Sequence, residues 1–158
     1  MIHGYQINRE ESMPTYAVNH SNFNLSADQK EEIARCITRT HNSVTGAQSY
    51  FVQVIFNGLP QGNHFIGGKL AAEPQLFLHG QIRAGRSPEV KEQLILDLRD
   101  SLAGVSGLDK SHIWIYLLDL IPSQMIEYGE ILPESGRESE WFAGLSPHLK
   151  EKLTSLGK

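Results

Sequence analysis

The sequence predicts an α/β fold of the mixed α+β kind, built from two consecutive β-α-β units. In each unit a strand pattern is followed by an amphipathic helix with recognisable ends, and then by a second strand pattern. Crossovers between parallel strands are right-handed, so the two strands of each unit are expected to run parallel. We therefore expect a small mixed sheet that carries both helices on one face.

Four segments rich in β-branched and aromatic residues predict the strands. They are residues 15–19 (TYAVN), 50–56 (YFVQVIF), 75–82 (QLFLHGQI) and 112–118 (HIWIYLL). The first two belong to one β-α-β unit and the last two to the other. The segment at 58–63 is rich in turn residues and predicts a loop between the units.

The first helix is predicted to begin at Ser26, because Gln29 three residues later completes a capping box. Gly46 is expected to end it. The face that packs on the sheet is formed by residues that recur every fourth position, namely Ile33, Ile37 and His41.

The second helix is predicted to begin at Ser87, with Pro88 at the first helical position, and to end at Gly107. Its buried stripe is formed by Val90, Leu94, Leu98 and either Leu102 or Val105. The tail adds a last helix, expected around Pro147–Leu156.

Length and charge narrow the classes of function. A chain of 158 residues fits one domain, and a net charge of −4 gives no electrostatic footprint for nucleic acid. No apolar run approaches the ~20 residues of a membrane span. With one cysteine, Cys36, no internal disulfide can form, and a reducing cytoplasm is expected. The uncovered face of the sheet is apolar enough to predict an oligomer.

Several familiar chemical motifs are absent from the sequence. There is no CxxC, HExxH, GxSxG or Walker loop, and the seven histidines have no ligand spacing. The sequence therefore gives no support for a metal-dependent enzyme, a serine hydrolase or a nucleotide-binding protein. We expect no metal site and no cofactor.

A methionine directly before a proline, Met13-Pro14, divides the chain. The residues after it read as a complete domain, whereas the twelve before it (MIHGYQINREES) match neither a secretory signal nor a typical transit peptide. We interpret residues 1–13 as an N-terminal extension or a misassigned start. As a chain terminus, Pro14 would carry a secondary amine that titrates near pH ~8. Within a longer chain its nitrogen is an imide and cannot act as acid, base or nucleophile.

Two arginines, Arg83 and Arg86, flank a glycine after the third predicted strand. Strand ends are where ligands bind in α/β sheets, and a guanidinium group matches a carboxylate in a bidentate manner. The pair predicts an anion site, or else a solvated loop. His41, at the end of the first helix, is either a ligand-binding residue or a satisfied core and capping residue.

Tyr116 and Glu127 are the remaining candidates. Tyr116 lies in an otherwise apolar strand, where packing alone also explains a tyrosine. Glu127 has apolar neighbours in QMIEYG, so desolvation would raise its pKa and suit it to general-base work. The alternative is an ordinary surface glutamate.

Taken in order, these residues resemble the tautomerase superfamily, and within it the cis-3-chloroacrylic acid dehalogenase group. The resemblance runs from Met13 to about Leu145. It is carried by residues 37–41 (ITRTH), 45–48 (TGAQ), 65–68 (FIGG), 83–87 (RAGRS), 112–116 (HIWIY), 125–129 (MIEYG) and 140–142 (EWF). It implies that residues 14–158 form a single tautomerase-like domain that assembles as a homotrimer.

The resemblance also implies a role for each candidate. Pro14 matches the catalytic proline, His41, Arg83 and Arg86 match the residues that bind a small carboxylate substrate, and Tyr116 with Glu127 matches the pair that activates water. The implied activity is cofactor-independent hydration or dehalogenation of a small unsaturated acid, or enol–keto tautomerisation.

The chain departs from the family at two places. Pro14 is not the first residue of the sequence, so a non-catalytic relative with a blocked proline, acting in binding or structure, is the alternative function. Ala47 stands where the established dehalogenases have a hydroxyl residue, which favours hydration or tautomerisation over dehalogenation.

Overall fold

The computed structural model describes residues 14–157, and the interpretation of residues 1–13 falls outside that range. The fold centres on a four-stranded sheet in the order β2-β1-β5-β6. β1 runs parallel to β2 and antiparallel to β5, and β5 runs parallel to β6. The bounds of these strands are Thr15–Ser21 for β1, Gln53–Gly58 for β2, Gln75–Arg83 for β5 and Ile113–Leu120 for β6. The two parallel pairs confirm the two predicted β-α-β units.

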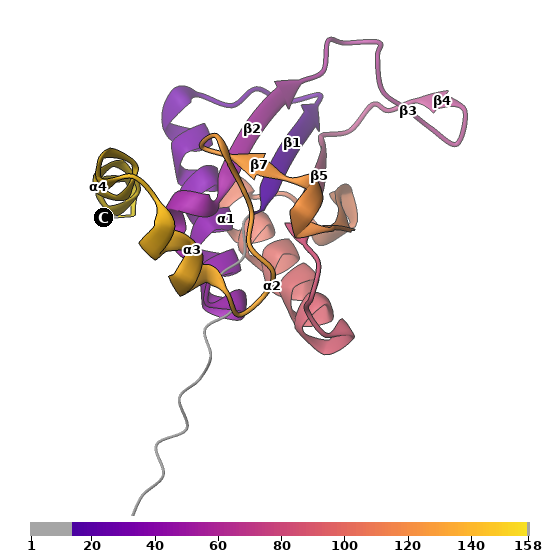
Figure 1. Ribbon diagram of the computed structural model, residues 1–158. Coiled ribbons are helices and arrows are strands. Elements are labelled where there is room, and N and C mark those ends of the chain that lie inside the picture. The colour runs from indigo at the N-terminus through magenta and orange to yellow at the C-terminus, as the bar shows by residue number, and fades with distance from the viewer. Residues whose placement is uncertain (1–13, 158) are drawn as a thin grey trace, which may run out of the picture.

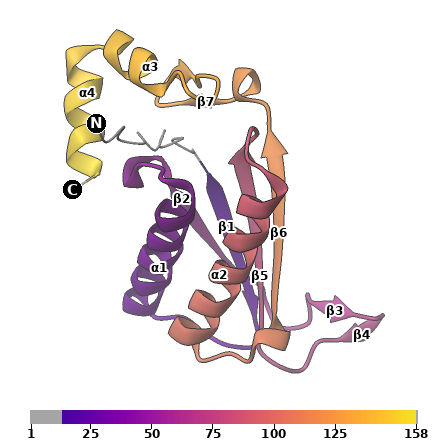
Figure 2. The ribbon, with the colours of Figure 1, turned by 90° about the horizontal axis from the view of Figure 1, so that it is seen from below.

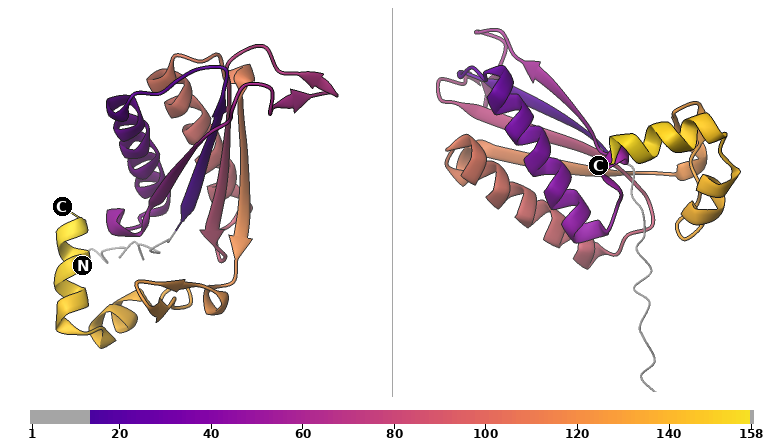
Figure 3. Two further views of the ribbon diagram at one scale, coloured as in Figure 1. Left: turned by 90° about the horizontal axis from the view of Figure 1, so that it is seen from above. Right: turned by 90° about the vertical axis from the view of Figure 1, so that its left-hand side faces the viewer.

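Both long helices pack on the same face of this sheet, as predicted (Figures 2 and 3). α1 spans Ala27–Thr45 and α2 spans Pro88–Ser106. Ser26 accepts from Gln29 in a complete capping box, and Ser87 caps α2 by accepting from the Val90 amide. Each helix ends at a left-handed glycine, at Gly46 and at Gly107. The predicted caps are therefore confirmed at both ends of both helices.

The core lies between the helices and the sheet. Its fully buried members include the predicted stripe of α1 and most of that of α2, where Val90 is only half-buried and Leu102 rather than Val105 is the last buried residue. The others come from alternate positions of three strands, and the cluster is Tyr16, Val18, Ile33, Ile37, Leu76, Leu78, Ile82, Leu94, Leu98, Leu102 and Ile113.

The opposite face of the sheet is not covered by helices. Its side chains alternate with the core positions, as the two-residue period of a strand requires. Ala17 is paired with Ile55 on one side and His79 on the other, and His79 is paired with Tyr116. Ile55 and Tyr116 are exposed, as are Trp114 and Leu118 beside them. We call this surface, made by Ala17, Ile55, Phe77, His79, Trp114, Tyr116 and Leu118, the open sheet face.

Two predicted strand starts are wrong. Residues 50–52 were expected in a strand, but Ser49–Phe51 forms a short 3₁₀ helix, η1, and β2 begins only at Gln53. His112 ends another, η2 (Lys110–His112), so β6 begins at Ile113. In both places aromatic or β-branched residues gave the chain strand propensity, and pairing with the neighbouring strand begins later.

Two hairpins were not predicted. β3 (Phe65–Ile66) and β4 (Lys69–Leu70) form a short arm that projects from the body (Figure 1). β7 (Ile126–Glu127) and β8 (Glu130–Ile131) follow η3 (Pro122–Gln124) in the C-terminal segment. Strands of two residues carry too little periodicity to be recognised in a sequence.

The C-terminal segment crosses one end of the sheet. After β8 it forms α3 (Glu138–Gly144) and then α4, whose bounds, Pro147–Leu156, are those predicted. In Figure 2 this segment runs from the end of β6 past the end of the sheet to α4. It therefore covers the end at which β1 begins. Among the described residues, no helix is long and apolar enough to cross a membrane.

Candidate active site

The strand directions bring most of the candidate residues to one end of the sheet. Because β1 is antiparallel to β5, the start of β1 lies beside the end of β5. α1 returns the chain to the start of β2, so its last turn lies at the same end. Pro14 is buried there, and its carbonyl accepts from the Gln53 amide at 3.0 Å. Arg83 ends β5, and His41 lies in the last turn of α1.

A pocket of about 650 Å³ lies at this end. Thr15, the residue after Pro14, lines it together with Gln53 and Leu120 from the neighbouring strands. The C-terminal segment closes it from the other side, and the remaining lining residues are Tyr50, Phe51, Val52, Gln124, Met125, Ile126, Glu127 and Tyr128. The cavity is thus bounded by the sheet end on one side and by the β7 turn on the other.

Glu127 is the acidic group of this pocket. Its partial burial raises the pKa of the carboxyl to about 7, and the charge of Arg83 acts in the opposite direction. A carboxyl with this pKa is ionised to a substantial degree at neutral pH and still accepts a proton readily. This is the behaviour that the apolar neighbours of Glu127 predicted.

The turn that presents Glu127 is held in an unusual conformation. Tyr128 and Gly129, its two central residues, have φ angles of 53° and 84°. Positive φ at both positions is the type I′ geometry, in which a tyrosine is rare. The Tyr128 hydroxyl donates to the Tyr50 carbonyl at 2.6 Å, and Lys152 Nζ lies 5.7 Å from its ring centroid. These contacts offset the strain and fix Glu127 at the pocket.

His41 is fully buried, and its Nδ1 lies 2.7 Å from the Tyr16 hydroxyl. Burial and, to a smaller degree, the charge of Arg86 together lower the pKa of the imidazole to about 3. Burial also raises the pKa of Tyr16, which therefore keeps its proton. When the Tyr16 hydroxyl donates to Nδ1, the neutral ring carries its hydrogen on Nε2. Nε2 has no hydrogen-bond partner among the described residues.

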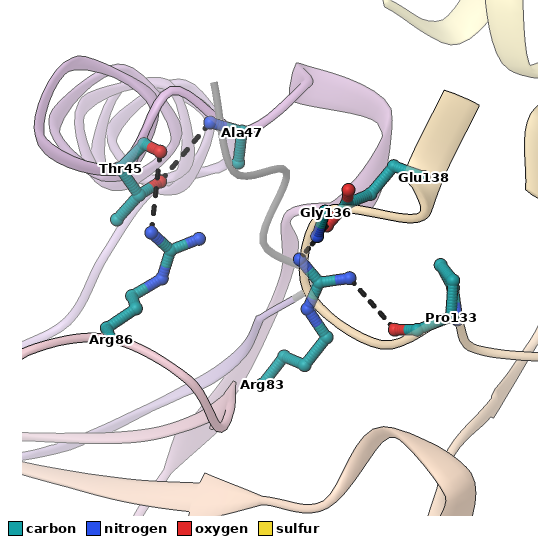
Figure 4. Close-up of polar contacts among 7 residues, drawn as sticks. All are labelled: Thr45, Ala47, Arg83, Arg86, Pro133, Gly136 and Glu138. Carbon is teal, nitrogen blue, oxygen red and sulfur yellow. Dashed lines mark hydrogen bonds and ion pairs between the residues drawn. The ribbon is translucent and has the colours of Figure 1, made fainter. Parts of the chain in front are cut away.

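The two arginines diverge within the site (Figure 4). Arg86 points to the end of α1, where its Nη1 donates to the Thr45 carbonyl at 3.4 Å. Arg83 points to the C-terminal segment, where it forms a buried ion pair with Glu138 and donates to the Pro133 carbonyl at 3.0 Å. Both guanidinium groups lie at the predicted end of the sheet, and the ion pair of Arg83 was not foreseen.

Tyr116 is not brought to the other candidates within one chain. It lies on the open sheet face, 54% exposed, with its ring 5.0 Å from that of Phe77. The pocket of Glu127 meets β6 at Leu120, four residues or roughly 13 Å further along the strand. Within one chain Tyr116 lines a different, smaller pocket with His64, Phe77 and Trp114, and it does not line the pocket of Glu127.

Three residues of the site were missed at the level of sequence. Tyr16 appeared only as part of a strand, Thr45 as part of a helix end, and Glu138 not at all. The alternation of side chains along β1 places Tyr16 on the face of the sheet that packs against the helices, so its proximity to His41 could have been predicted from the sequence. A 55-residue separation between Arg83 and Glu138 gave none.

The described residues contain no group of three or more histidine, cysteine, aspartate or glutamate side chains able to hold a metal ion. The polar groups of this end are instead two arginines, a neutral imidazole and a carboxyl with a raised pKa. This inventory is suited to binding an organic anion and moving protons.

A mixed sheet of two β-α-β units is the fold that the resemblance to the tautomerase superfamily implied. The family model Tautomerase_3, described as "Putative oxalocrotonate tautomerase enzyme", matches residues 13–144. The chain belongs to this family.

Solved structures agree with this assignment. N1, a member of the cis-3-chloroacrylic acid dehalogenase (cis-CaaD) family, is 34% identical, with a TM-score of 0.84 over 89% of this chain and 99% of that chain. Pt0534, inactivated by 2-oxo-3-pentynoate, is 24% identical, with a TM-score of 0.68 over 75% of this chain and 94% of that chain. A fused 4-OT, a symmetric trimer, is 18% identical, with a TM-score of 0.68 over 75% and 94%. No curated protein matches the chain.

Proposed function

We propose that this protein is a cofactor-independent acid–base enzyme that adds water to small unsaturated carboxylic acids. Substrates of the 3-haloacrylate or propiolate type, and enols that tautomerise, fit this chemistry. The observation that carries the proposal is Glu127, a carboxyl with a pKa of about 7 that lines a pocket beside the start of β1. The likeness to N1, of the cis-CaaD family, supports the same class of substrate.

The substrate carboxylate is bound by cationic and neutral donors together. Arg83 and Arg86 supply guanidinium groups, and His41 supplies the Nε2–H that the Tyr16 hydrogen bond defines. Because His41 is neutral, it adds a hydrogen bond without adding charge. Drawing electron density onto the carboxylate makes the β-carbon of the unsaturated acid electrophilic.

Glu127 and Pro14 act on opposite ends of the multiple bond. Glu127 takes a proton from water as the water oxygen bonds to the β-carbon, and the π electrons move toward the α-carbon. A protonated terminal amine at Pro14 gives its proton to the α-carbon. The result is a hydrated acid, which loses halide as HX when the β-carbon carries a halogen. General-base assistance of this kind contributes roughly 10²–10⁴-fold to rate.

Tyr116 joins this site from a second subunit of a homotrimer. Its place on the open sheet face, among apolar exposed residues, supports an assembly in which that face is covered. Mixing the single variants Tyr116→Phe and Glu127→Gln tests this arrangement. Trimers of mixed composition would contain some sites with both residues intact, so activity would recover in part. A mixture no more active than its components would contradict a shared site.

The experiment that tests the function compares two forms of the protein. Protein that begins at Pro14 is expected to hydrate a propiolate-type acid, because its terminal amine exchanges a proton. Protein that retains residues 1–13 is expected to be inactive, because an imide nitrogen does not. The family match begins at Met13, which supports this choice of terminus. Equal activity of the two forms would refute the role of Pro14.

The alternative function is a non-catalytic binding or structural protein of the same fold. The peptide bond between Met13 and Pro14 in the sequence is the observation that favours it. Intact-mass measurement of protein made from the native gene discriminates the two. A mass that includes residues 1–13, together with absence of turnover, supports the alternative.

A further inference from the structure

Arg83 forms a buried ion pair with a residue to which the resemblance assigns no role. Arg83 ends β5 and Glu138 begins α3, and their ion pair is almost completely buried, with side chains 2% and 6% exposed. The Gly136 amide donates to the same Glu138 oxygen at 3.2 Å, and Arg83 also donates to the Pro133 carbonyl (Figure 4). Residues 133–138 thus surround the guanidinium group with fixed acceptors.

A second ion pair on the same helix provides the contrast. Arg137 and Glu140 pair at 2.7 Å with side chains 65% and 70% exposed. Solvent can replace either partner of that pair, and exposed pairs of this kind contribute little. The side chains of the Arg83–Glu138 pair are almost inaccessible to water. Removal of one partner would leave the other charge buried without a counter-ion, so the remaining side chain would have to reorient.

The direction of the Arg83 side chain matters to the site. The positive charge of Arg83 lowers the pKa of the Glu127 carboxyl, whereas burial raises it. Arg86, three residues along, is oriented differently, toward the neutral carbonyl of Thr45. A rotation of the Arg83 side chain would therefore change the angle between the two guanidinium groups.

We propose that Glu138 is a positioning residue, which holds the Arg83 guanidinium in the orientation that binds the substrate carboxylate. The inference rests on the proposed function, in which Arg83 binds that carboxylate. The C-terminal segment then has a second task beyond presenting Glu127. Through Glu138 it also holds Arg83, the last residue of β5.

Two substitutions disturb the position and the charge of Glu138 one at a time. Glu138→Asp keeps the charge but shortens the side chain by one methylene, and Glu138→Gln keeps the shape but removes the charge. With protein that begins at Pro14, each is expected to weaken binding of propanoate, a saturated probe that cannot be hydrated, by roughly tenfold, and to lower kcat/KM by up to about 10²-fold. Glu140→Gln, on the same helix, is the matched control and is expected to bind propanoate as the wild type does.

A double substitution separates positioning from a merely structural role. In an Arg83→Gln background, replacing Glu138 should cause no further loss of propanoate affinity, because Glu138 acts through Arg83. Losses of equal size in both backgrounds would overturn the proposal. Tighter binding of propanoate by Glu138→Gln would also overturn it, since Glu138 would then be only a charge that competes with the substrate.

Failure of the proposed function is recognised separately. In that case wild-type protein neither binds propanoate nor hydrates a propiolate-type acid. The Arg83 Nε–Hε resonance in an NMR spectrum of the wild type and of Glu138→Asp then decides the inference. A resonance that moves to the position of exposed arginines in the variant supports positioning by Glu138, and an unchanged resonance overturns it.

Discussion

The raised pKa of Glu127 leads to a quantitative prediction for the pH dependence of hydration. A general base must be ionised, so activity is lost as pH falls through its pKa. With a pKa of about 7, Glu127 is ionised to about 1% at pH 5 and about 9% at pH 6, a change of roughly ninefold. With an ordinary glutamate pKa, the same interval would change the ionised fraction by only about 1.3-fold.

The assay is kcat/KM for hydration of a propiolate-type acid between pH 5 and 6, with protein that begins at Pro14. This parameter reports the free enzyme, and an α-amine is fully protonated throughout the interval. The change of kcat/KM with pH in this interval therefore reports the ionisation of Glu127 alone. The Glu127→Gln variant should lose rate by roughly 10²–10⁴-fold and lose the slope as well. A ninefold rise that persists in Glu127→Gln would refute the assignment.

The same pKa has a consequence for stability. Because the folded pKa lies above the unfolded one, the favourable contribution is present below about pH 4.5 and is lost as pH rises through about 7. Glu127→Gln removes this titration. The variant should therefore gain melting temperature relative to the wild type between pH 5 and pH 8, and a constant difference across that range would show that the carboxyl titrates normally in the fold.

Three further substitutions test other parts of the site. Arg86→Ala should weaken inhibition by propanoate and lower kcat/KM by about 30-fold or more, since loss of one partner of a desolvated charge pair costs roughly 2–5 kcal/mol; unchanged inhibition would remove Arg86 from the anion site. Tyr16→Phe should destabilise the fold by about 1–3 kcal/mol in denaturant, because His41 loses its 2.7 Å partner in the core. Gly129→Ala should cost about 1–2 kcal/mol in the same measurement, because its φ is 84° while a Cβ would meet no atom within 4 Å.

The regular parts of the fold were predictable because local signals agreed with tertiary packing. The capping box at Ser26 and the glycines that end both helices are short-range features, and each fixes a boundary without reference to the rest of the chain. The start of β2 was misplaced because Tyr50, Phe51 and Val52 have strand propensity, whereas Ser49–Phe51 forms the 3₁₀ helix η1 and Val52 follows it. In the structure Phe51 is buried against Leu132 of the C-terminal segment, a long-range contact that cannot be predicted from the local sequence.

The candidate site was predictable only as a set of residues. The topology explains why Pro14, His41, Arg83 and Arg86 lie at one end of the sheet, since each stands at the start or end of an element. Their partners are set by long-range contacts instead. Neither the ion pair of Arg83 with Glu138 nor the position of Tyr116 on the open sheet face follows from spacing along the chain.

The support of His41 shows how the core and the site depend on each other. Tyr16 occupies a core position of β1, yet its hydroxyl is hydrogen-bonded to the imidazole of His41, which we propose binds the substrate carboxylate. The ring of Tyr16 fits only because Gly80 lies opposite it in β5, where an added Cβ would come within 2.6 Å of Tyr16 Cε1 and 2.7 Å of Leu117 Cδ2. A strand glycine, which weakens a sheet on its own, is thus required here by the close approach of an aromatic ring. The chemistry proposed for His41 therefore depends on a residue that does not line the pocket.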